Sequence, residues 1–480
     1  MLENLKPEKV FKYFEEISKI PHCSKNEKEL SDYIVVFAKE RGIKYIQDDA
    51  LNVILLKEAT KGYEDAEPII LQGHMDMVCE KTSDSNHDFE KEPLELIVDG
   101  DYITAKDTTL GGDNGIAVAM ILALFDEDNI SHPKIEAILT TDEETGLFGA
   151  ESIDVSMLEG KRLINLDSEE EGIFTVSCAG GSTALGVSPI SRENVKGNII
   201  GIKVSGLLGG HSGAEIDKER ANASKLIGRM LYKLSENFKF VINKAQGGFA
   251  DNVITKEAYA EIVCMDESIS DIMAEIENFN RVIRHEFKAV DPDIKVVAEN
   301  LGVKEVDAIS KVDSFKVLSY LNLLPQGIQN MSKEIDGLVE TSLNIGIVKA
   351  EDEEFNVTLS VRSSVETRID EVQQKIVNLT KILGGKMTFD GRYPGWEYKT
   401  DSKLRDKMIS VYEEMYNEKP EIMAIHAGLE CGFFAQKIEG VDCISIGPWL
   451  YDVHTPDEKL SISSTQRIWE YLVNLLEQLK

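Results

Sequence analysis

Hydrophobic runs that end in polar residues organise the chain up to about residue 180. Apolar positions recur at helical spacing over residues 8–19 and 26–41, which predicts two amphipathic helices. A glycine-rich turn opens a third, apolar helix at "GGDNGIAVAMILALFDE" (111–127). Three apolar runs predict buried strands: "AEPIILQGHMDMV" (66–78), "PKIEAILTTDEE" (133–144) and "KRLINLDSEEEG" (161–172). Because strands alternate with helices, we predict an α/β layer with a mostly parallel sheet.

The pattern changes in the middle of the chain. Apolar and polar residues alternate over 182–210 and 340–364, as in antiparallel strands, and the second stretch predicts a hairpin around Glu351–Glu354. Helical stretches lie between them (219–237 and 267–288), and a helix (401–420) and short strands such as "DCISIG" (442–447) follow. We therefore expect an α/β domain made of residues 1–181 and 391–480, with an inserted α+β domain at 182–390. The insert is long enough for two α+β units side by side, with "GIKVSG" and "VTLSVRSS" as equivalent parts.

Composition and charge narrow the classes of function. A chain of 480 residues, 42% hydrophobic and 29% charged, is typical of a globular protein of two or three domains. The net charge of −33 argues against nucleic acid and anionic membranes as partners. We find neither a signal-peptide core at the start nor a run near the roughly 20 apolar residues of a membrane helix. The six cysteines are scattered without CxxC spacing, so we expect reduced, mostly buried thiols and a cytoplasmic location.

Imidazole and carboxylate side chains gather at the ends of the apolar segments. In open α/β sheets, ligands bind beyond the carboxyl ends of the strands. One such histidine or acid alone is usually an ordinary polar, capping or solvated residue. Several together, without a thiolate among them, suit zinc, and also manganese or cobalt. The candidates in chain order are His74, Asp76, Asp113, Glu143, Glu144, Asp167 and His454.

At this point the chain resembles a known family. The series "GHMDMV", "GGDNGIAVA", "TTDEETGLFGA", "INLDSEEEG", "GGHSG" and "HTPDE" looks like the motif series of the M20 metallopeptidases. The long insert and "HAGLECGFF" (426–434) look most like its Xaa-His dipeptidase (aminoacyl-histidine dipeptidase) subgroup. The resemblance covers essentially the whole chain. It implies a zinc-peptidase-type catalytic domain with an inserted lid, and hydrolysis of Xaa-His and related dipeptides by a hydroxide that bridges two divalent metal ions, most often zinc.

The resemblance also implies the ligand set. Asp113 would bridge the two ions, because a carboxylate has two oxygens to span the gap between them. His74 and Asp167 would complete one ion, and Glu144 and His454 the other. Asp76, two residues beyond His74, would orient the imidazole of that histidine and raise its basicity. In the family the peptide bond after the bridging aspartate is cis, which here would join Asp113 to Asn114.

Further residues take roles from the same resemblance. Glu143 would be the general base, which passes a proton from the bridging water to the leaving amine. His211 in "LLGGHSG" would stabilise the oxyanion, after domain closure or from another subunit. Arg362 in "LSVRSS" would bind the substrate's C-terminal carboxylate in bidentate fashion. The remaining substrate-binding candidates are Asn252, Gly428, whose backbone could receive a carboxylate, Glu430, which could meet the free amino group, and His426.

Two other functions stay open. The chain could be a related amidohydrolase, such as an N-acyl amino acid deacylase or a tripeptidase. It could also be a non-catalytic relative that binds or scaffolds, although such a relative would be expected to have lost a ligand or Glu143. Of these, "HAGLECG" and the large insert favour the dipeptidase. We expect small dipeptides as the substrates and a homodimer as the oligomeric state.

Overall fold

The computed structural model describes residues 2–265 and 268–480, which form two compact units. Unit 1 contains the chain up to Cys178, Trp396–Ala424 and Leu429–Lys480. Unit 2 contains Ala179–Gly395 and Ile425–Gly428. The segment assigned to the insert from sequence, 182–390, lies wholly inside unit 2. Unit 2 also takes the short piece Ile425–Gly428, which the sequence analysis had left in the catalytic domain.

The centre of unit 1 is an eight-stranded mixed sheet with the order β1-β2-β6-β3-β7-β19-β8-β18. Its four middle strands, β6, β3, β7 and β19, run parallel, whereas β1, β2 and β8 pair antiparallel with their neighbours. This confirms the predicted α/β class. The strands are β1 (Lys44–Gln47), β2 (Val53–Lys57), β3 (Ile69–His74), β6 (Ile135–Thr140), β7 (Arg162–Asn165), β8 (Ile173–Cys178), β18 (Glu421–Ile425) and β19 (Asp442–Ser445).

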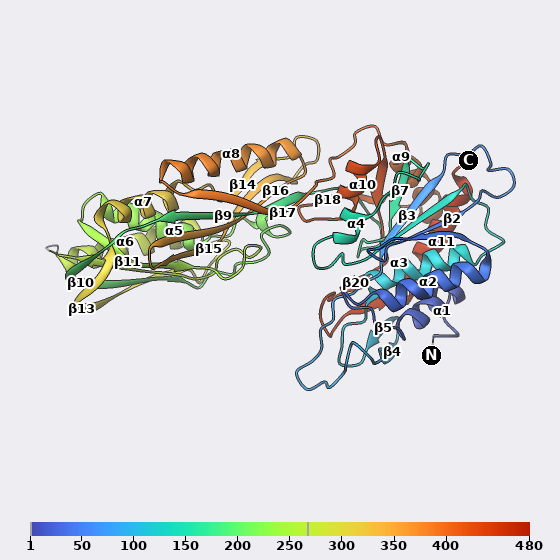
Figure 1. Cartoon of the computed structure of the whole chain (residues 1–480), viewed down its shortest axis with the longest axis horizontal. Helices are drawn as coiled ribbons and strands as arrows, with labels where there is room; N and C mark the ends of the chain where they lie inside the picture. Colours follow the sequence, from blue (N-terminus) through green and yellow to red (C-terminus); the bar gives the residue numbers. More distant parts are fainter. Residues whose placement is uncertain (1, 266–267) are drawn as a thin grey trace. The chain divides into compact units, whose positions relative to one another are not determined.

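Helices cover this sheet, and both chain ends belong to unit 1 (Figure 1). Helix α3 packs on β3 and under α1, and every residue from Ile116 to Phe125 is buried, which explains its uniformly apolar sequence. The helices are α1 (Glu8–Ile17), α2 (Lys28–Arg41), α3 (Gly112–Phe125), α4 (Phe148–Ser152), α9 (Lys403–Tyr416), α10 (Cys431–Lys437) and α11 (Ile462–Gln478). A small sheet adds β4 (Leu96–Asp99), β5 (Tyr102–Ala105), β20 (Leu450–Tyr451) and β21 (Lys459–Ser461).

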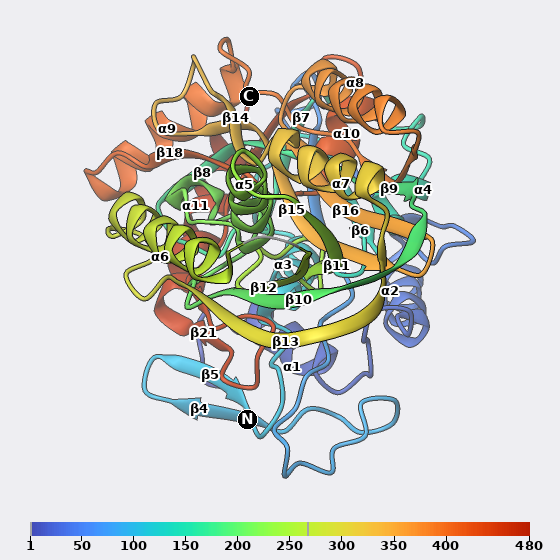
Figure 2. The ribbon, with the colours of Figure 1, turned by 90° about the vertical axis from the view of Figure 1, so that its left-hand side faces the viewer.

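Unit 2 is built on a nine-stranded sheet in the order β13-β10-β12-β11-β15-β16-β9-β17, with β14 paired to β15. Figure 2 shows helices α5 to α8 along one face of this sheet, where they enclose its apolar core. The predicted hairpin is confirmed, since Glu351 on β15 pairs with Glu354 on β16. The strands are β9 (Gly180–Pro189), β10 (Arg192–Ser205), β11 (Phe240–Gly247), β12 (Ala258–Cys264), β13 (Lys295–Ile309), β14 (Gly327–Met331), β15 (Val339–Glu351), β16 (Glu354–Ser363) and β17 (Lys386–Tyr393).

The same topology occurs twice in unit 2. One half runs β10-α5-β11-β12-α6-β13 and the other β9-α7-β15-β16-α8-β17, and in each the fourth strand lies beside the first and the third beside the second. In the sheet the halves meet edge to edge, where Gln246 and Gly247 of β11 pair with Lys349 and Val348 of β15. The proposed equivalence of "GIKVSG" and "VTLSVRSS" is wrong, because the former lies on a first strand (β10) and the latter on a third (β16). The helices are α5 (Ala223–Ser235), α6 (Ile269–Glu286), α7 (Lys311–Leu323) and α8 (Glu366–Ile382).

Across the described ranges, 2–265 and 268–480, we find no helix whose length and apolar content would let it cross a membrane.

Candidate active site

Three neighbouring parallel strands bring the predicted ligands of unit 1 to one edge of the sheet. His74 is the last residue of β3, and in the sheet register it lies opposite Thr140, the last residue of β6. Glu143 and Glu144 lie three and four residues beyond the end of β6, and Asp167 lies two residues beyond the end of β7. Because the strands are parallel, their carboxyl ends meet at one place, as in other open α/β sheets.

Asp113 reaches this edge from the first turn of α3. Its backbone is not helical (φ −84°, ψ 106°), and the peptide bond to Asn114 is cis, as the family resemblance implied. Gly111 precedes it in the left-handed region (φ 68°), where a side chain would collide with the sulfur of Met77. The carboxylate lies between two histidines: Oδ1 is 3.2 Å from Nε2 of His74 and Oδ2 is 3.2 Å from Nε2 of His454.

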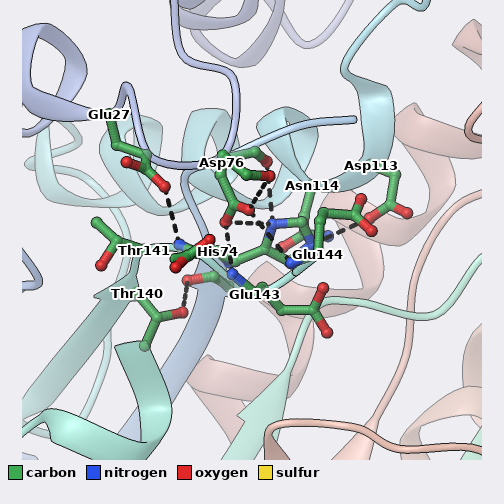
Figure 3. Close-up of polar contacts among 12 residues, drawn as sticks. Glu27, His74, Asp76, Asp113, Asn114, Thr140, Thr141, Glu143 and Glu144 are labelled. Atoms are coloured by element: carbon green, nitrogen blue, oxygen red, sulfur yellow. Dashed lines mark hydrogen bonds and ion pairs between the residues drawn. The ribbon is translucent and has the colours of Figure 1, made fainter. Parts of the chain in front are cut away.

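Two more carboxylates complete the arrangement. Oδ1 of Asp167 lies 3.4 Å from Nε2 of His74, and Oε1 of Glu144 lies 2.9 Å from Nε2 of His454. Two atoms that bind one zinc ion at about 2.0–2.1 Å in tetrahedral geometry are about 3.3 Å apart. The spacing of these donor atoms, together with their mixed nitrogen and oxygen character, therefore fits a divalent cation. Figure 3 shows His74, Asp113 and Glu144 directed toward a common point.

The charges of the cluster favour a cation in the same place. Burial disfavours a charged His74, yet the surrounding carboxylates, Asp167 first, raise the pKa of its imidazole well above the ordinary value. Hydrogen bonds to Asp113 and Glu144 raise the pKa of His454 to about 11. Burial raises the pKa of Asp167 to about 6. Protons on the two histidines thus offset the crowded acids in the metal-free protein, and metal ions could do so in their stead.

Asp76 contacts both His74, a predicted metal ligand, and the backbone of the loop after β6. Its carboxylate is fully buried, and its Oδ1 lies 3.4 Å from Nδ1 of His74. Oδ1 also accepts the backbone N–H of Glu143 (3.0 Å), and Oδ2 accepts that of Glu144 (3.2 Å) (Figure 3). Oδ2 also accepts the hydroxyl of Ser24 (2.8 Å). Burial raises the pKa of Asp76, but the hydrogen bond and charge of His74, followed by the bonds from Glu143 and Ser24, lower it below the ordinary value, so the group is ionised.

The side chain of Glu143 differs from that of Glu144 in its surroundings. Burial, followed by repulsion from acids such as Asp167 and Glu430, raises the pKa of Glu143 well above its ordinary value. Glu144 instead points its carboxylate at His454. The adjacent acids therefore have separate environments, as expected of residues that leave a strand in different directions. Asp142 accepts a hydrogen bond from the Thr145 hydroxyl.

A second group of predicted residues comes together in unit 2. The chain near His211 pairs with the chain near Asn252, since Ser212 donates its N–H to the carbonyl of Asn252 (2.8 Å). Nδ1 of His211 accepts the N–H groups of Gly213 (3.2 Å) and Ala214 (3.0 Å), which leaves Nε2 as the proton-bearing donor. Burial, and then the charge of Arg362, lower the pKa of His211 and keep the ring neutral.

Arg362 and His426 belong to the same part of unit 2. A Cβ atom added to Gly213 would contact the His426 carbonyl, Cε1 of His211 and Nε of Arg362, so the three residues surround this glycine. Arg362 donates from Nη1 to the Tyr393 hydroxyl (2.7 Å), whereas its Nε is buried without a partner. His426 is buried and bonded to the Ser342 hydroxyl (2.8 Å), and burial lowers its pKa to about 3.

The remaining predicted residues lie elsewhere. Gly428 is at the end of the short piece that belongs to unit 2. Glu430 is fully buried in unit 1, where its Oε2 accepts hydrogen bonds from Gln72 and the Thr140 hydroxyl. Burial raises its pKa to about 8, so the carboxyl group is protonated at neutral pH. Contact between Glu430 and a substrate amine stays a prediction, and the structure places the group inside the core.

The expectation of six reduced thiols is wrong for one pair, since Cys23 and Cys79 form a disulfide. Their segments lie side by side: Ser24 donates its N–H to the Met77 carbonyl, and Met77 donates to the His22 carbonyl. A separation of 56 residues concealed this proximity in the sequence. The other four cysteines are free and buried, as expected.

Four residues near the site have side-chain contacts that the sequence did not predict: Ser24, Glu27, Asn114 and Glu458. Glu27 accepts the N–H of Asp142 (2.9 Å) and so holds the start of the loop after β6 (Figure 3). Asn114 and Glu458 lie inside the motifs "GGDNG" and "HTPDE", next to predicted ligands, and this position in the sequence indicated that they belong near the site. Ser24 and Glu27 are ordinary polar residues in sequence, and only the packing shows their contacts.

The α/β fold, with imidazole and carboxylate donors at the carboxyl edge of its sheet, defines a metal-dependent hydrolase. The model of Peptidase family M20/M25/M40 matches residues 70–478, and the chain belongs to this family of metallopeptidases, which hydrolyse peptide bonds. The chain is 35% identical over 481 residues to the cytosol non-specific dipeptidase of Escherichia coli (strain K12), and the match covers 100% of this chain and 99% of that protein.

Solved structures agree with this assignment. The crystal structure of aminoacylhistidine dipeptidase from Vibrio alginolyticus matches with a TM-score of 0.95 and 36% identity, over 100% of this chain and 98% of that one. Aminopeptidase PepT from Bacillus cereus ATCC 10987 has a TM-score of 0.57 and 15% identity over 99% of both chains, and this likeness shows the shared fold.

Proposed function

We propose that the chain is a dinuclear metal dipeptidase that hydrolyses Xaa-His and related dipeptides with Glu143 as general base. The observation that carries the two-ion proposal is the position of Asp113. Each of its two carboxylate oxygens lies 3.2 Å from a different histidine nitrogen, on His74 and His454. The same nitrogen of each histidine also lies near one further carboxylate, that of Asp167 for His74 and that of Glu144 for His454. The ligand set is therefore two half-sites that share one bridging group.

Two bound divalent cations would acidify a water molecule and polarise the scissile carbonyl. Zinc is the usual metal in this family, and cobalt and manganese are the alternatives. Glu143 takes the proton of that water and gives it to the leaving amine. Burial raises the pKa of Glu143 above its ordinary value, which makes the carboxylate a stronger base for the first step. Asp76 keeps Glu143 in place through the backbone N–H and leaves its side chain free to move the proton.

Residues of unit 2 would bind the substrate. His211 is neutral with Nε2–H as a donor, which suits the stabilisation of an oxyanion. Arg362 has a buried Nε without a partner and could bind a C-terminal carboxylate through its planar fork. His426, Asn252 and Gly428 complete the proposed substrate-binding set in this unit.

The names of the relatives support the substrate class. One relative is called a non-specific dipeptidase and the other an aminoacylhistidine dipeptidase, and each is matched over nearly its whole length. A deacylase or tripeptidase remains the alternative within the family. The homodimer and the cytoplasmic location also remain predictions, and the Escherichia coli relative is named for the cytosol.

The test combines metal analysis with a substrate panel. Purified protein should contain two ions per chain and release histidine from β-Ala-His and Gly-His, with little release of acetate from acetylated amino acids or cleavage of tripeptides. Glu143→Gln should keep both ions and lose turnover by about 10²–10⁴-fold. Asp142→Asn, the same change one residue earlier, should retain near-normal turnover. Cleavage of acetylated substrates alone, or near-normal turnover of Glu143→Gln, would overturn the proposal.

A further inference from the structure

Another buried carboxylate, that of Glu458, contacts the backbone of the predicted bridging residue, Asp113. It is 2% exposed and follows the turn between β20 and β21 that carries His454. Its Oε2 accepts the backbone N–H groups of Leu110 (2.7 Å) and Gly111 (3.1 Å). Its Oε1 accepts those of Gly112 (2.8 Å) and Asp113 (3.2 Å). One side chain thus binds four consecutive amides that end at Asp113.

The local sequence is adapted to this contact. The first N–H groups of a helix have no partner within the helix, and here they are buried, so an acceptor is required. A Cβ atom on Gly112 would lie 3.2 Å from Oε1 of Glu458 and 2.7 Å from Cδ2 of Leu450. Glycine at this position therefore lets the backbone approach the carboxylate closely.

The same carboxylate is joined to the other ligand of the second half-site. Glu458 follows His454 by four residues, and its N–H donates to the Thr455 carbonyl (3.1 Å), which closes the turn. The turn with His454 and the backbone of Asp113 are therefore held together through Glu458. His454 itself lies on the connection between two short strands, β20 and β21, which belong to the small sheet and not to the central one.

The other half-site has a separate support. Asn114 accepts the backbone N–H of His74 at Oδ1 (3.2 Å) and donates from Nδ2 to the Leu166 carbonyl (2.8 Å), next to Asp167. His74 and Asp167 also follow two paired central strands, β3 and β7. His74 and Asp167 thus have supports that do not involve Glu458, whereas Asp113 is shared by both half-sites.

We propose that Glu458 is a positioning residue that sets the spacing of Asp113 and His454, and so controls the affinity for the ion held by Asp113, Glu144 and His454. The ion on the side of His74 and Asp167 shares only Asp113 with this half-site, so its affinity depends less on Glu458. This inference rests on the proposed two-ion site. It differs from a simple helix-capping role, which would change folding stability and affect both ions alike.

The test compares Glu458→Gln with Asp457→Asn, an identical chemical change at the adjacent, exposed acid. The glutamine keeps the size of the side chain but replaces one acceptor oxygen with an NH₂ group, which cannot accept the backbone N–H groups. Metal-free proteins are titrated with Co²⁺, and the two binding steps are followed by visible absorption and by metal content after dialysis. Asp457→Asn should bind both ions as the unmodified protein does.

Glu458→Gln should bind the second ion about 10- to 100-fold more weakly, with a smaller loss for the first ion, which shares only Asp113. Unchanged affinity for both ions, or an equal loss at both, would overturn the positioning role. If the unmodified protein binds only one ion, the two-ion proposal fails instead. Should Glu458→Gln not fold, Glu458→Asp serves in its place, because it keeps both oxygens but is one methylene too short. Selective weakening of the second ion is again the expected result, and equal effects on both ions contradict it.

Discussion

Replacement of Asp76 by alanine should destabilise unit 1 and weaken metal binding together. The carboxylate of Asp76 is fully buried and accepts the N–H groups of Glu143 and Glu144 at 3.0 and 3.2 Å. Alanine leaves both amides without this acceptor, at a cost of about 1–3 kcal/mol each, or about 2–6 kcal/mol in total. The Ser24 hydroxyl is half-buried and can turn to water, so it adds little.

The effect on metal affinity has a separate origin. Asp76 lies 3.4 Å from Nδ1 of His74, and removal of a charged partner of a ligating histidine costs about 10- to 100-fold in affinity. The backbone carbonyl of Asp76 also lies 3.0 Å from Nδ1 and remains in the variant. The ring therefore keeps its orientation, and we expect a loss near the lower end of that range.

Tryptophan fluorescence is a suitable assay for the stability change. All three tryptophans, Trp396, Trp449 and Trp469, lie in unit 1, so urea denaturation of the metal-free protein reports on the unit that contains Asp76. Asp76→Asn should lie between the unmodified protein and Asp76→Ala, because its single oxygen can still accept one amide. Asp142→Asn is the matched control on the same loop, and asparagine tolerates the left-handed backbone found there (φ 52°).

Two results would refute this account of Asp76. If Asp76→Ala unfolds at the same urea concentration as the unmodified protein, the two amides do not depend on its carboxylate. If the stability falls but zinc affinity is unchanged, Asp76 supports the loop and not the ligand His74.

Three further predictions concern other parts of the molecule. The pKa of His426 is about 3 in the folded chain, below its value of about 6.5 in the unfolded chain. The unfolded chain therefore binds the proton first, and the free energy of unfolding falls by about 1.4 kcal/mol per pH unit as the pH drops from 6.5 toward 3. His426→Gln should remove that slope in circular-dichroism unfolding curves of the metal-free protein, and an unchanged slope contradicts the assignment. Arg362→Lys should raise KM about tenfold with a smaller effect on kcat, because lysine cannot bind a carboxylate in bidentate fashion; an unaltered KM excludes Arg362 from substrate binding. The Cys23–Cys79 disulfide closes a loop of 56 residues, so its reduction should destabilise unit 1 by up to about 4 kcal/mol. Urea titrations with and without dithiothreitol measure this change, and equal midpoints would show that the disulfide contributes nothing to stability.

The candidate ligand residues were accessible from the sequence for a simple physical reason. A buried parallel strand is a continuous apolar run, so its last residue is visible as the point where polar residues begin. His74, Glu144 and Asp167 stand at such points, and parallel strands place their ends at one edge of a sheet. The hairpin at Glu351–Glu354 was visible for a related reason, since alternation with a short polar break is a local pattern.

The supporting residues were not accessible in the same way. The bonds from Asp76 to two amides of another loop, and from Glu458 to four amides about 345 residues earlier, depend on which segments the fold brings together. The same is true of the Cys23–Cys79 disulfide, which contradicted the expectation of free thiols. The burial of Glu430 follows from its position against Gln72 and Thr140, and its sequence context alone suggested an accessible group.

The sequence by itself determined the α/β class, the positions of the strand ends, the set of metal-ligand candidates and membership of a family, because all of these rest on local patterns of a few to a dozen residues. The tertiary structure alone decided which candidate residues lie close to one another. It placed one oxygen of Asp113 near each histidine, separated Glu143 from the ligands, moved Ile425–Gly428 into unit 2 and revealed the doubled sheet of that unit. These features depend on distances between residues far apart in the chain, which only packing determines.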